Sequence, residues 1–311
     1  MMENKLDVKK LQQQDKIVRI ISKTVIYTFL VIMAIIVIIP FYWMIITGMK
    51  NETEVTLFPP TLYPNEVHLE NFINVLLPKV KDSNNPDILV HNSFQFVTFF
   101  KNTMLVAVIS MVGTLVTTIL AAYAFAKMEF KGKDAIFALL LATMMIPGEM
   151  MVITNYLTVA DFGWLNSYSG VVTSMTVPFF VSVFYIFLLR QNFMQIPHEL
   201  YLAAKVDGKS DFLYLMKVMI PLAMPTITTI IILKIMGAWN SYAWPNLVAN
   251  KEEWRLITNG LRGAFTDSGT GRTAENLQMA ATFIVTLPLL IMFLCFRKYI
   301  MSGVSRSGIK G

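Results

Sequence analysis

Residues 196–225 read IPHELYLAAKVDGKSDFLYLMKVMIPLAMP and separate two long apolar stretches of the chain. The segment is too polar to lie in lipid, and its residue order predicts helical structure. Pro197 suits a first helical position because proline loses no helical hydrogen bond there, and the Glu199 carboxylate suits the positive end of the helix dipole. Gly208, about three turns later, is typical of a left-handed helix end. The first predicted helix therefore covers residues 197–208.

A second helix is predicted directly after this glycine. Ser210 or Asp211 can cap its N-terminus, and the helix is expected to cover residues 212–219 and to stop at Pro221. The segment thus encodes a helix, a glycine turn and a helix between two apolar stretches.

Two interpretations of the first helix are open. Ala203 and Ala204 form a patch of small residues that would let another protein surface approach closely. An amphipathic helix resting on lipid headgroups is the other possibility. The residues alone support the two interpretations about equally.

The composition indicates an integral membrane protein. Of the 311 residues 55% are hydrophobic and 15% are charged, and the mean hydropathy is +0.56, whereas soluble domains carry about 25% charged residues. We interpret the net charge of +6 as lysine and arginine that hold loops on the cytoplasmic side, and not as a nucleic-acid site. The single cysteine, Cys295, has no partner for an intrachain disulfide and no metal-ligand spacing.

Six stretches are apolar enough to span a bilayer, which takes about 20 residues. They cover residues 25–48, 103–126, 135–158, 170–189, 226–248 and 277–296. Lysine and arginine number 17 on the side of the two termini and 8 on the opposite side, and this bias predicts that both termini are cytoplasmic. The predicted fold class is therefore an all-α integral membrane protein with six transmembrane helices, in which residues 196–225 face the cytoplasm.

These spans divide the chain into regions. They are a cytoplasmic N-terminal arm (1–24), a first transmembrane helix (25–48), an extracytoplasmic loop (49–102), a five-span core (103–296) that includes the cytoplasmic loop 190–225, and a cytoplasmic tail (297–311). The first span is too long for the core of a cleaved signal peptide and is expected to be retained. The extracytoplasmic loop is rich in proline and turn formers and has too few apolar residues for a core of its own.

Two ionisable residues fall inside predicted spans. Lys234 lies about eight residues, or about 12 Å, into the fifth span, where snorkelling or pairing with another helix is favoured over contact with a substrate. An acidic substrate would give this lysine a role in the substrate path. Glu149 follows Pro147 and Gly148 in the third span. We interpret these three residues as a gate or hinge, and a purely structural role for Glu149 is equally supported.

The segment at 196–225 resembles the EAA loop of the permease subunits of binding-protein-dependent ABC importers. The family pattern reads E-A-A-x-x-D-G, a spacer, a hydrophobic residue, a proline and a second proline. The matching residues are Ala203, Ala204, Asp207, Gly208, Pro221 and Pro225. In that family the loop is a coupling helix that docks into a cleft on an ATPase subunit. Leu202 replaces the usual glutamate of the motif, so Glu199 or Lys205 is expected to carry more of this contact.

Other blocks extend the resemblance over most of the chain. MMIPGEMMVITNYL (144–157), GWLNSYSG (163–170), WNSYAWPNLV (239–248) and the final SGIKG (307–311) are similar to the sugar-permease branch that includes the shorter subunit of the maltose permease. In this branch the first span commonly precedes a five-span permease core.

The third of these blocks supplies the candidate substrate path. Its aromatic faces would stack on a sugar ring and its amides would bond to sugar hydroxyls. The candidates are Trp239, Asn240, Tyr242, Trp244 and Asn246, together with Lys234. Asn240 lies one turn before Trp244, so both are expected on one face of the fifth helix. An aromatic belt with a helix-packing asparagine is the alternative.

The resemblance implies a permease subunit of an ATP-driven sugar importer. It would work with a second homologous permease, two ATPase subunits and an extracytoplasmic solute-binding protein. The chain has no GxxxxGK(S/T), HExxH or CxxC motif, so ATP and Mg are expected on the ATPases, and no catalytic residue, metal or cofactor is expected in this chain.

Three alternatives to this reading are open. An importer for a peptide, an amino acid or phosphate would share the coupling loop. A membrane enzyme or receptor would need more polar residues inside the spans. An ion-driven transporter would usually have more intramembrane carboxylates and an internal repeat.

Overall fold

The computed structural model describes residues 2–77, 79–81, 89–91, 94–265 and 274–305. This part of the chain is helical apart from loops and one short pair of strands, so the predicted all-α class is confirmed. The chain forms two compact units, Met1–Phe72 with Ala274–Phe283, and Ile73–Thr273 with Ile284–Gly311.

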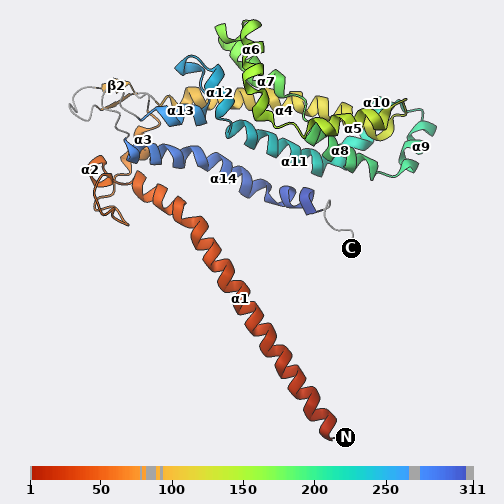
Figure 1. The fold of residues 1–311 in the computed structure, drawn as a ribbon, viewed down its shortest axis with the longest axis horizontal. Helices are drawn as coiled ribbons and strands as arrows, with labels where there is room; N and C mark the ends of the chain where they lie inside the picture. The colour runs from red at the N-terminus through yellow and green to blue at the C-terminus, as the bar shows by residue number, and fades with distance from the viewer. Residues whose placement is uncertain (1, 78, 82–88, 92–93, 266–273, 306–311) are drawn as a thin grey trace. The chain divides into compact units, whose positions relative to one another are not determined.

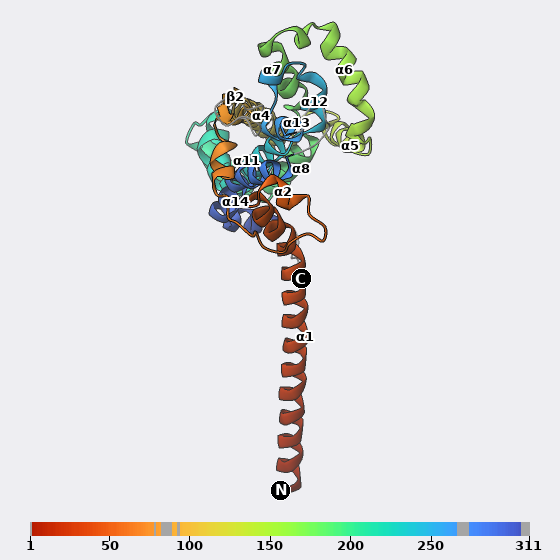
Figure 2. The ribbon, with the colours of Figure 1, turned by 90° about the vertical axis from the view of Figure 1, so that its left-hand side faces the viewer.

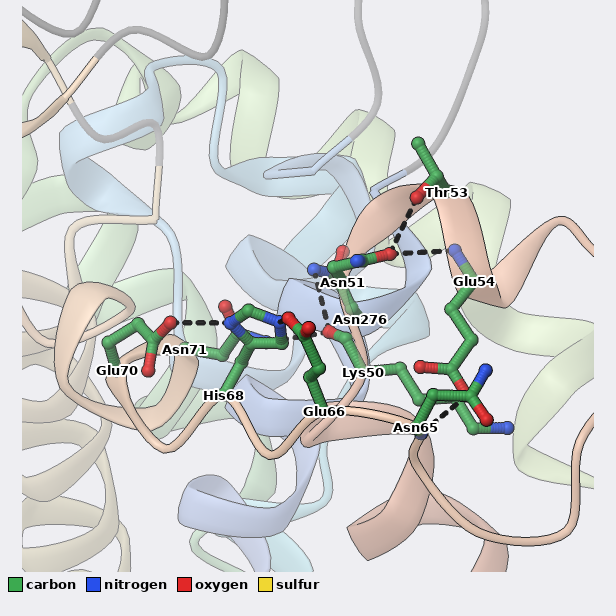
Figure 3. A network of polar contacts seen from close by, with 10 residues as sticks. All are labelled: Lys50, Asn51, Thr53, Glu54, Asn65, Glu66, His68, Glu70, Asn71 and Asn276. Carbon is green, nitrogen blue, oxygen red and sulfur yellow. Dashed lines mark hydrogen bonds and ion pairs between the residues drawn. The ribbon is translucent and has the colours of Figure 1, made fainter.

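The first unit is built on one long helix, drawn in red in Figures 1 and 2. Its elements are α1 (Met2–Gly48), α2 (Glu52–Val55), the start of α3 (Glu70–Asn74) and the start of α14 (Glu275–Ser305). Every side chain of α1 from 16 to 42 is exposed, although most of them are apolar. A helix with such an apolar surface is suited to face lipid. The loops after α1 are held by a network of polar contacts, which Figure 3 shows.

The second unit contains the other helices and an antiparallel pair of strands in which Val80 faces Val90. In chain order its elements are β1 (Lys79–Lys81), β2 (Leu89–His91), α4 (Phe96–Lys127), α5 (Lys133–Thr143), the 3₁₀ helix η1 (Gly148–Met151), α6 (Val152–Asp161), η2 (Trp164–Asn166), α7 (Tyr168–Thr176), η3 (Val177–Phe179), α8 (Val183–Met194), α9 (His198–Val206), α10 (Asp211–Tyr214), the π-helix η4 (Leu215–Met219), α11 (Ile220–Trp239), α12 (Ala243–Val248), η5 (Glu252–Trp254), α13 (Ile257–Gly263) and the rest of α14.

The core of the second unit surrounds α4, which packs along both α8 and α11 (Figure 1). One apolar cluster joins the C-terminal half of α4 to α8, α9 and α11, and includes Tyr123, Phe193 and Tyr214. A second cluster joins its N-terminal half to α6, α7 and α12, and includes Val106 and Trp244. Figure 2 shows α6, α7, α12 and α13 gathered together.

Four helical stretches are each long and apolar enough to cross a membrane. They are Lys16–Gly48, Phe96–Lys127, Asp211–Trp239 and Glu275–Arg297. Two further candidates are pairs of shorter helices bent at a break, by 82° between α5 and η1–α6 and by 47° between α7–η3 and α8. The predicted number of six spans is reached within the described residues only if each bent pair counts as one span.

The third predicted span, 135–158, is not one continuous helix. Helix α5 ends at Thr143, and the chain turns before Pro147, which precedes η1 in an extended conformation. Proline has no N–H to continue an α-helix and disfavours helical geometry in the residue before it. The Pro147–Glu149 segment therefore marks a sharp bend.

The predicted stop at Pro221 is also wrong, because one helix continues from Asp211 to Trp239. A wide π-turn precedes the proline, and in it the Ile220 N–H donates to the Leu215 carbonyl. In an α-helix the Pro221 ring would clash with the carbonyl four residues before it. A π-turn at this place relieves that crowding and lets the helix pass.

The same helix ends earlier than the predicted fifth span of 226–248. It stops at Trp239, and α12 begins separately at Ala243. Pro245 explains the break, since its ring would clash with the Ser241 carbonyl in a continuous helix. The helical face that was expected to hold both Asn240 and Trp244 is thus interrupted.

Candidate functional site

A cavity of about 470 Å³ lies in the second unit between α4, the broken α7–α8 pair, α11 and α12. Its polar lining groups are Ser110, Ser182, Tyr185, Lys234, Ser241 and Trp244, and the apolar lining comes from residues such as Val106, Phe179 and Leu256. Three hydroxyl-bearing serines, two aromatic side chains with a polar atom and one cation therefore face a largely apolar space. Such a mixture can both stack on and hydrogen-bond to a polyhydroxylated molecule.

The break between α7 and α8 forms one wall of this cavity. Pro178 lies at the start of the short η3 turn, and Ser182 caps α8 by accepting a bond from the Tyr185 N–H. The carbonyls freed by this break find donors on α4: Thr114 Oγ1 donates to the Phe179 carbonyl at 3.3 Å, and Thr117 Oγ1 to the Phe180 carbonyl at 2.7 Å. Non-helical backbone at membrane depth requires such partners.

Lys234 is the third donor at the break. Its Nζ donates to the Phe179 carbonyl at 3.0 Å, and its side chain lines the cavity. A cation at the C-terminal end of a helical segment is favoured by the helix dipole. The pairing with another helix predicted for this lysine is therefore present. Because an ammonium group has three donors, Lys234 can also offer a hydrogen bond to a molecule in the cavity.

The aromatic and amide candidates separate into different environments. Trp244 lines the cavity, with its indole N–H bonded to the Ser174 carbonyl at 3.0 Å and its ring edge-on to Phe179. Trp239 is buried elsewhere and donates to the Val285 carbonyl at 3.2 Å. The Tyr242 hydroxyl accepts a bond from Arg262 at 2.8 Å.

Only part of the predicted set therefore meets at the cavity. Of the six predicted path residues, Lys234 and Trp244 line it, whereas Trp239, Asn240, Tyr242 and Asn246 are outside its lining. Sequence reasoning missed Ser110, Ser182, Ser241 and Tyr185. Their only sequence signal is a hydroxyl in or beside an apolar stretch, which many helices carry for packing alone.

The Pro147, Gly148 and Glu149 candidates lie at the sharp bend and outside the cavity lining. All three are exposed, and no other part of the chain lies within 4 Å of a Cβ added at Gly148. These three residues therefore form an exposed bend between α5 and η1.

The second candidate site is helix α9, whose ends match the predicted signals closely. The helix begins at His198 directly after Pro197 and has Glu199 in its first turn. Gly208 has φ +71°, and Ser210, not Asp211, caps the next helix by accepting a bond from the Leu213 N–H.

One face of α9 is exposed. It consists of Glu199, Leu202, Ala203 and Val206, which we call the α9 outer face. The spacing i, i+3, i+4, i+7 places these residues on one stripe of the helix. Val206 is 88% exposed. The stripe is apolar after its first residue, so Leu202 extends an apolar surface where a glutamate would have added charge.

The other predicted residues of α9 face inward or make internal contacts. Ala204 is 4% exposed and belongs to the apolar cluster around α4, so the two alanines of the motif have different environments. Asp207 is paired with Lys209 at 3.2 Å, beside the glycine turn.

Asp211 fastens α9 to its neighbours. Its Oδ1 contacts Lys205 Nζ at 3.0 Å, accepts a bond from the Tyr201 hydroxyl at 3.0 Å and from the Tyr123 hydroxyl of α4 at 3.5 Å. This pairing raises the pKa of Lys205 above its ordinary value of 10.5. We call these four residues the Asp211 clamp. Lys205 therefore has an ionic partner within the chain, and its side chain is 38% exposed.

A second tie connects the entry of α9 to α4. Lys127, at the C-terminal end of α4, donates from Nζ to the Ile196 carbonyl at 2.8 Å. Arg190 of α8 donates to the Phe125 carbonyl of α4 at 3.0 Å. The helix with the exposed apolar stripe is thus attached at both of its ends to elements that lead into the apolar bundle.

No group of three or more His, Cys, Asp or Glu side chains is arranged to hold a metal ion within the part of the chain that the structure describes.

Comparison with known proteins gives consistent results. Residues 113–306 match the family described as binding-protein-dependent transport system inner membrane component. The arabinooligosaccharides transport system permease protein AraQ of Bacillus subtilis (strain 168) is 30% identical over 75% of this chain and 81% of its own length. The sn-glycerol-3-phosphate transport system permease protein UgpE of Rhizobium meliloti (strain 1021) is 28% identical over 92% of this chain and 97% of its own length.

A solved structure has a similar fold. It is the crystal structure of a bacterial ABC transporter involved in the import of the acidic polysaccharide alginate, one chain of which superposes with a TM-score of 0.75 at 24% identity and covers 90% of this chain and 96% of that chain. At this identity the likeness concerns the fold.

Proposed function

The chain belongs to the family of binding-protein-dependent transport system inner membrane components, and from this premise we propose that it is the permease subunit of an ATP-driven sugar importer in the cell membrane. In this proposal each bent helix pair is one span, both termini face the cytoplasm, and α9 is the coupling helix. A second homologous permease, two ATPase subunits and an extracytoplasmic solute-binding protein complete the transporter.

The α9 outer face is the observation that carries the proposal. Its exposed Leu202, Ala203 and Val206 have no reason to face water in an isolated loop, and their small or aliphatic side chains fit a hydrophobic cleft on a partner. The missing motif glutamate is consistent with this, since an apolar stripe would dock through burial of surface and less through charge. Glu199 remains at the edge of the stripe for a polar contact.

The Asp211 clamp and the Lys127 tie supply the mechanical link. When the ATPases close, a displacement of α9 passes through Asp211 to Tyr123 of α4, and through Ile196 to Lys127 of the same helix. Because α4 lines the cavity, movement of α9 changes the access to that cavity. The transporter then alternates between a state open to the outside and a state open to the cytoplasm, because ATP and the loaded binding protein bind these two states with different affinities.

Two observations bear on the solute. The serines, Tyr185 and Trp244 in the cavity suit a sugar, and the relative AraQ is named for arabino-oligosaccharides. Lys234 in the same lining favours a solute with an anionic group as a second candidate, and the relative UgpE is named for sn-glycerol-3-phosphate. The cavity supports both a neutral and an anionic solute. A sugar that carries a phosphate or a uronate would bond to the serine and tyrosine hydroxyls and to the Lys234 ammonium together.

Uptake measurements test the proposal. The gene is deleted in its host, and uptake of labelled arabino-oligosaccharides, uronide oligomers, sn-glycerol-3-phosphate and a peptide is measured. We expect loss of one of the first three, with return on re-expression of the intact gene. Loss of sn-glycerol-3-phosphate uptake alone would favour the second candidate over a sugar. Unchanged uptake of all three solutes would contradict both candidates, and loss of peptide uptake alone would indicate a different solute.

A pair of variants tests the coupling surface. Val206→Glu places a carboxylate in the proposed apolar contact at its most exposed residue, which should weaken docking by about 2 kcal/mol or more. Met128→Glu, at an exposed residue before α5 on the same proposed side of the membrane, is the matched control. Uptake and co-purification of ATPase subunits should both fall for the first variant and stay unchanged for the second. Equal behaviour of the two variants would refute docking through the α9 outer face.

A further inference from the structure

The loop after α2 in the first unit combines exposed apolar side chains with an unusual lack of charge. Residues 55–65 read VTLFPPTLYPN and contain no charged residue. Four large side chains of this loop are exposed: Leu57, Phe58, Leu62 and Tyr63. Phe58 is 95% exposed. We call residues 57–63 the apolar tip.

Polar contacts within the same unit hold this tip in place. Lys50 is 2% exposed and donates from Nζ to the Thr61 carbonyl at 2.6 Å. Glu54, also buried, accepts bonds from the Thr61 hydroxyl at 2.8 Å and from the Asn65 N–H at 3.0 Å. Figure 3 shows Glu54, Asn65 and the Lys50 side chain close together. A loop braced by buried charged groups is a formed surface.

Two asparagines of the same polar network hold the end of α1. Asn71 donates to the carbonyls of Gly48 and Lys50, each at 2.9 Å, and Asn276 donates to the Lys50 carbonyl at 3.3 Å. The residues that brace the apolar tip are therefore themselves fastened to the last turn of the long helix.

The tip folds back along the side of α1. The Tyr42 hydroxyl donates to the Leu62 carbonyl at 2.7 Å, and Tyr42 precedes the end of α1 at Gly48 by six residues, or about 9 Å along the helix axis. Tyr42 is the last residue of the exposed stretch of α1, which begins at residue 16 and is suited to face lipid. The apolar tip thus continues that surface.

The backbone of the tip is also suited to a lipid boundary. Pro59 and Pro60 in the tip and Pro64 directly after it have no N–H, so three donors that would need water or a partner are absent. The carbonyls of Thr61 and Leu62 are already paired. Tyr42 donates to the Leu62 carbonyl and the next residue, Tyr63, is exposed; tyrosine is typical of the membrane–water interface.

From these observations we propose that residues 57–63 insert into the lipid interface and anchor the loop between α2 and α3 against the membrane at the C-terminal end of α1. The occupant of this surface is the headgroup and upper acyl region of the bilayer. The proposal depends on the membrane location of α1 and not on the identity of the solute.

Spin-label accessibility in the full chain tests this proposal. In a Cys295→Ser background, Phe58→Cys and Leu62→Cys are labelled with a nitroxide, and Glu66→Cys, from the 80% exposed Glu66 side chain of the same loop, is the control. The chain is purified with its accompanying subunits and placed in phosphatidylethanolamine and phosphatidylglycerol vesicles. All three positions are exposed, so the substitutions leave the packing of the unit intact.

The ratio of collisions with oxygen to collisions with a water-soluble nickel chelate reports lipid contact. We expect this ratio to be several-fold higher at 58 and 62 than at 66. Nickel accessibility at 58 and 62 equal to that at 66 would place the tip in water and overturn the proposal. Protection of 58 and 62 from both reagents would show a partner protein on this surface and would overturn it equally.

Discussion

At the scale of single residues, Lys234 shows how an intramembrane charge is accommodated. The lysine does not sit unpaired among apolar residues, because it closes the end of a broken helix by bonding the Phe179 carbonyl. The same side chain lines the cavity. Lys234 therefore combines a structural contact at the break before α8 with a place in the cavity lining.

This dual role leads to a prediction for Lys234→Met. Loss of the donor should lower the free energy of unfolding by about 1–3 kcal/mol, the usual effect of losing a hydrogen bond to a charged group. Lys217→Met, an exposed lysine in the same continuous helix, should change it little. Thermal unfolding in detergent measures both variants, and an equal stability of the two would argue against the helix-capping role.

The Asp211 clamp is the other lesson at this scale. The resemblance led to the prediction that Glu199 or Lys205 contacts an ATPase, and the structure shows that Lys205 also has a partner within the chain, Asp211. The raised pKa of Lys205 means that its ammonium group stays charged at neutral pH and loses its charge only as the pH rises past the raised value. The clamp is thus intact at neutral pH.

At the scale of elements, the turn after α9 depends on a residue without a side chain. Gly208 has φ +71°, and no other part of the chain lies within 4 Å of an added Cβ. A substitution there is opposed by backbone conformation and not by crowding. This turn sets the direction from α9 into the helix that begins at Asp211.

Gly208→Ala is therefore predicted to lower the free energy of unfolding by about 1–2 kcal/mol, the cost of a left-handed conformation for an L-residue. Gly237→Ala is the control, since Gly237 lies within α11 with equally free space and no positive φ, and a helical alanine is favoured over glycine by about 1 kcal/mol. Denaturant unfolding should show opposite signs for the two variants. A loss of stability in both would point to packing rather than to the turn.

At the scale of the whole molecule, the proposed function requires that the cavity be reached alternately from the two sides of the membrane. Ser182 lines the cavity, so Ser182→Cys in a Cys295→Ser background reports access. An impermeant thiol reagent should label it several-fold faster from the outside when ATP and the loaded binding protein are present, and from the cytoplasmic side in their absence. Ser174→Cys, buried outside the lining, should stay unlabelled throughout.

Labelling of Ser182→Cys from one side only, under every condition, would exclude alternating access to this cavity. The outcome does not depend on which sugar is carried, so it separates the mechanism from the solute assignment.

The sequence by itself determined the features that are set within a few residues. Hydropathy over about 20 residues predicts the spans, and the glycine and serine signals predict the end of α9 and the start of the next helix, because caps and turns depend on local backbone chemistry. Only tertiary structure decided how the helices bend and what faces the cavity. Pro221 is passed by a π-turn, and Trp239 faces the core while Trp244 faces the cavity.

The physical reason is the range of the interactions. The Phe179 carbonyl is paired with donors 55 and 65 positions away in the chain. Lys205 is paired with a carboxylate on the next helix, Asp211, which also accepts bonds from two tyrosines. A free carbonyl or charge must find a partner, but a local pattern does not say which helix supplies it. The packing of α4, α8 and α11 determines which helix supplies each partner.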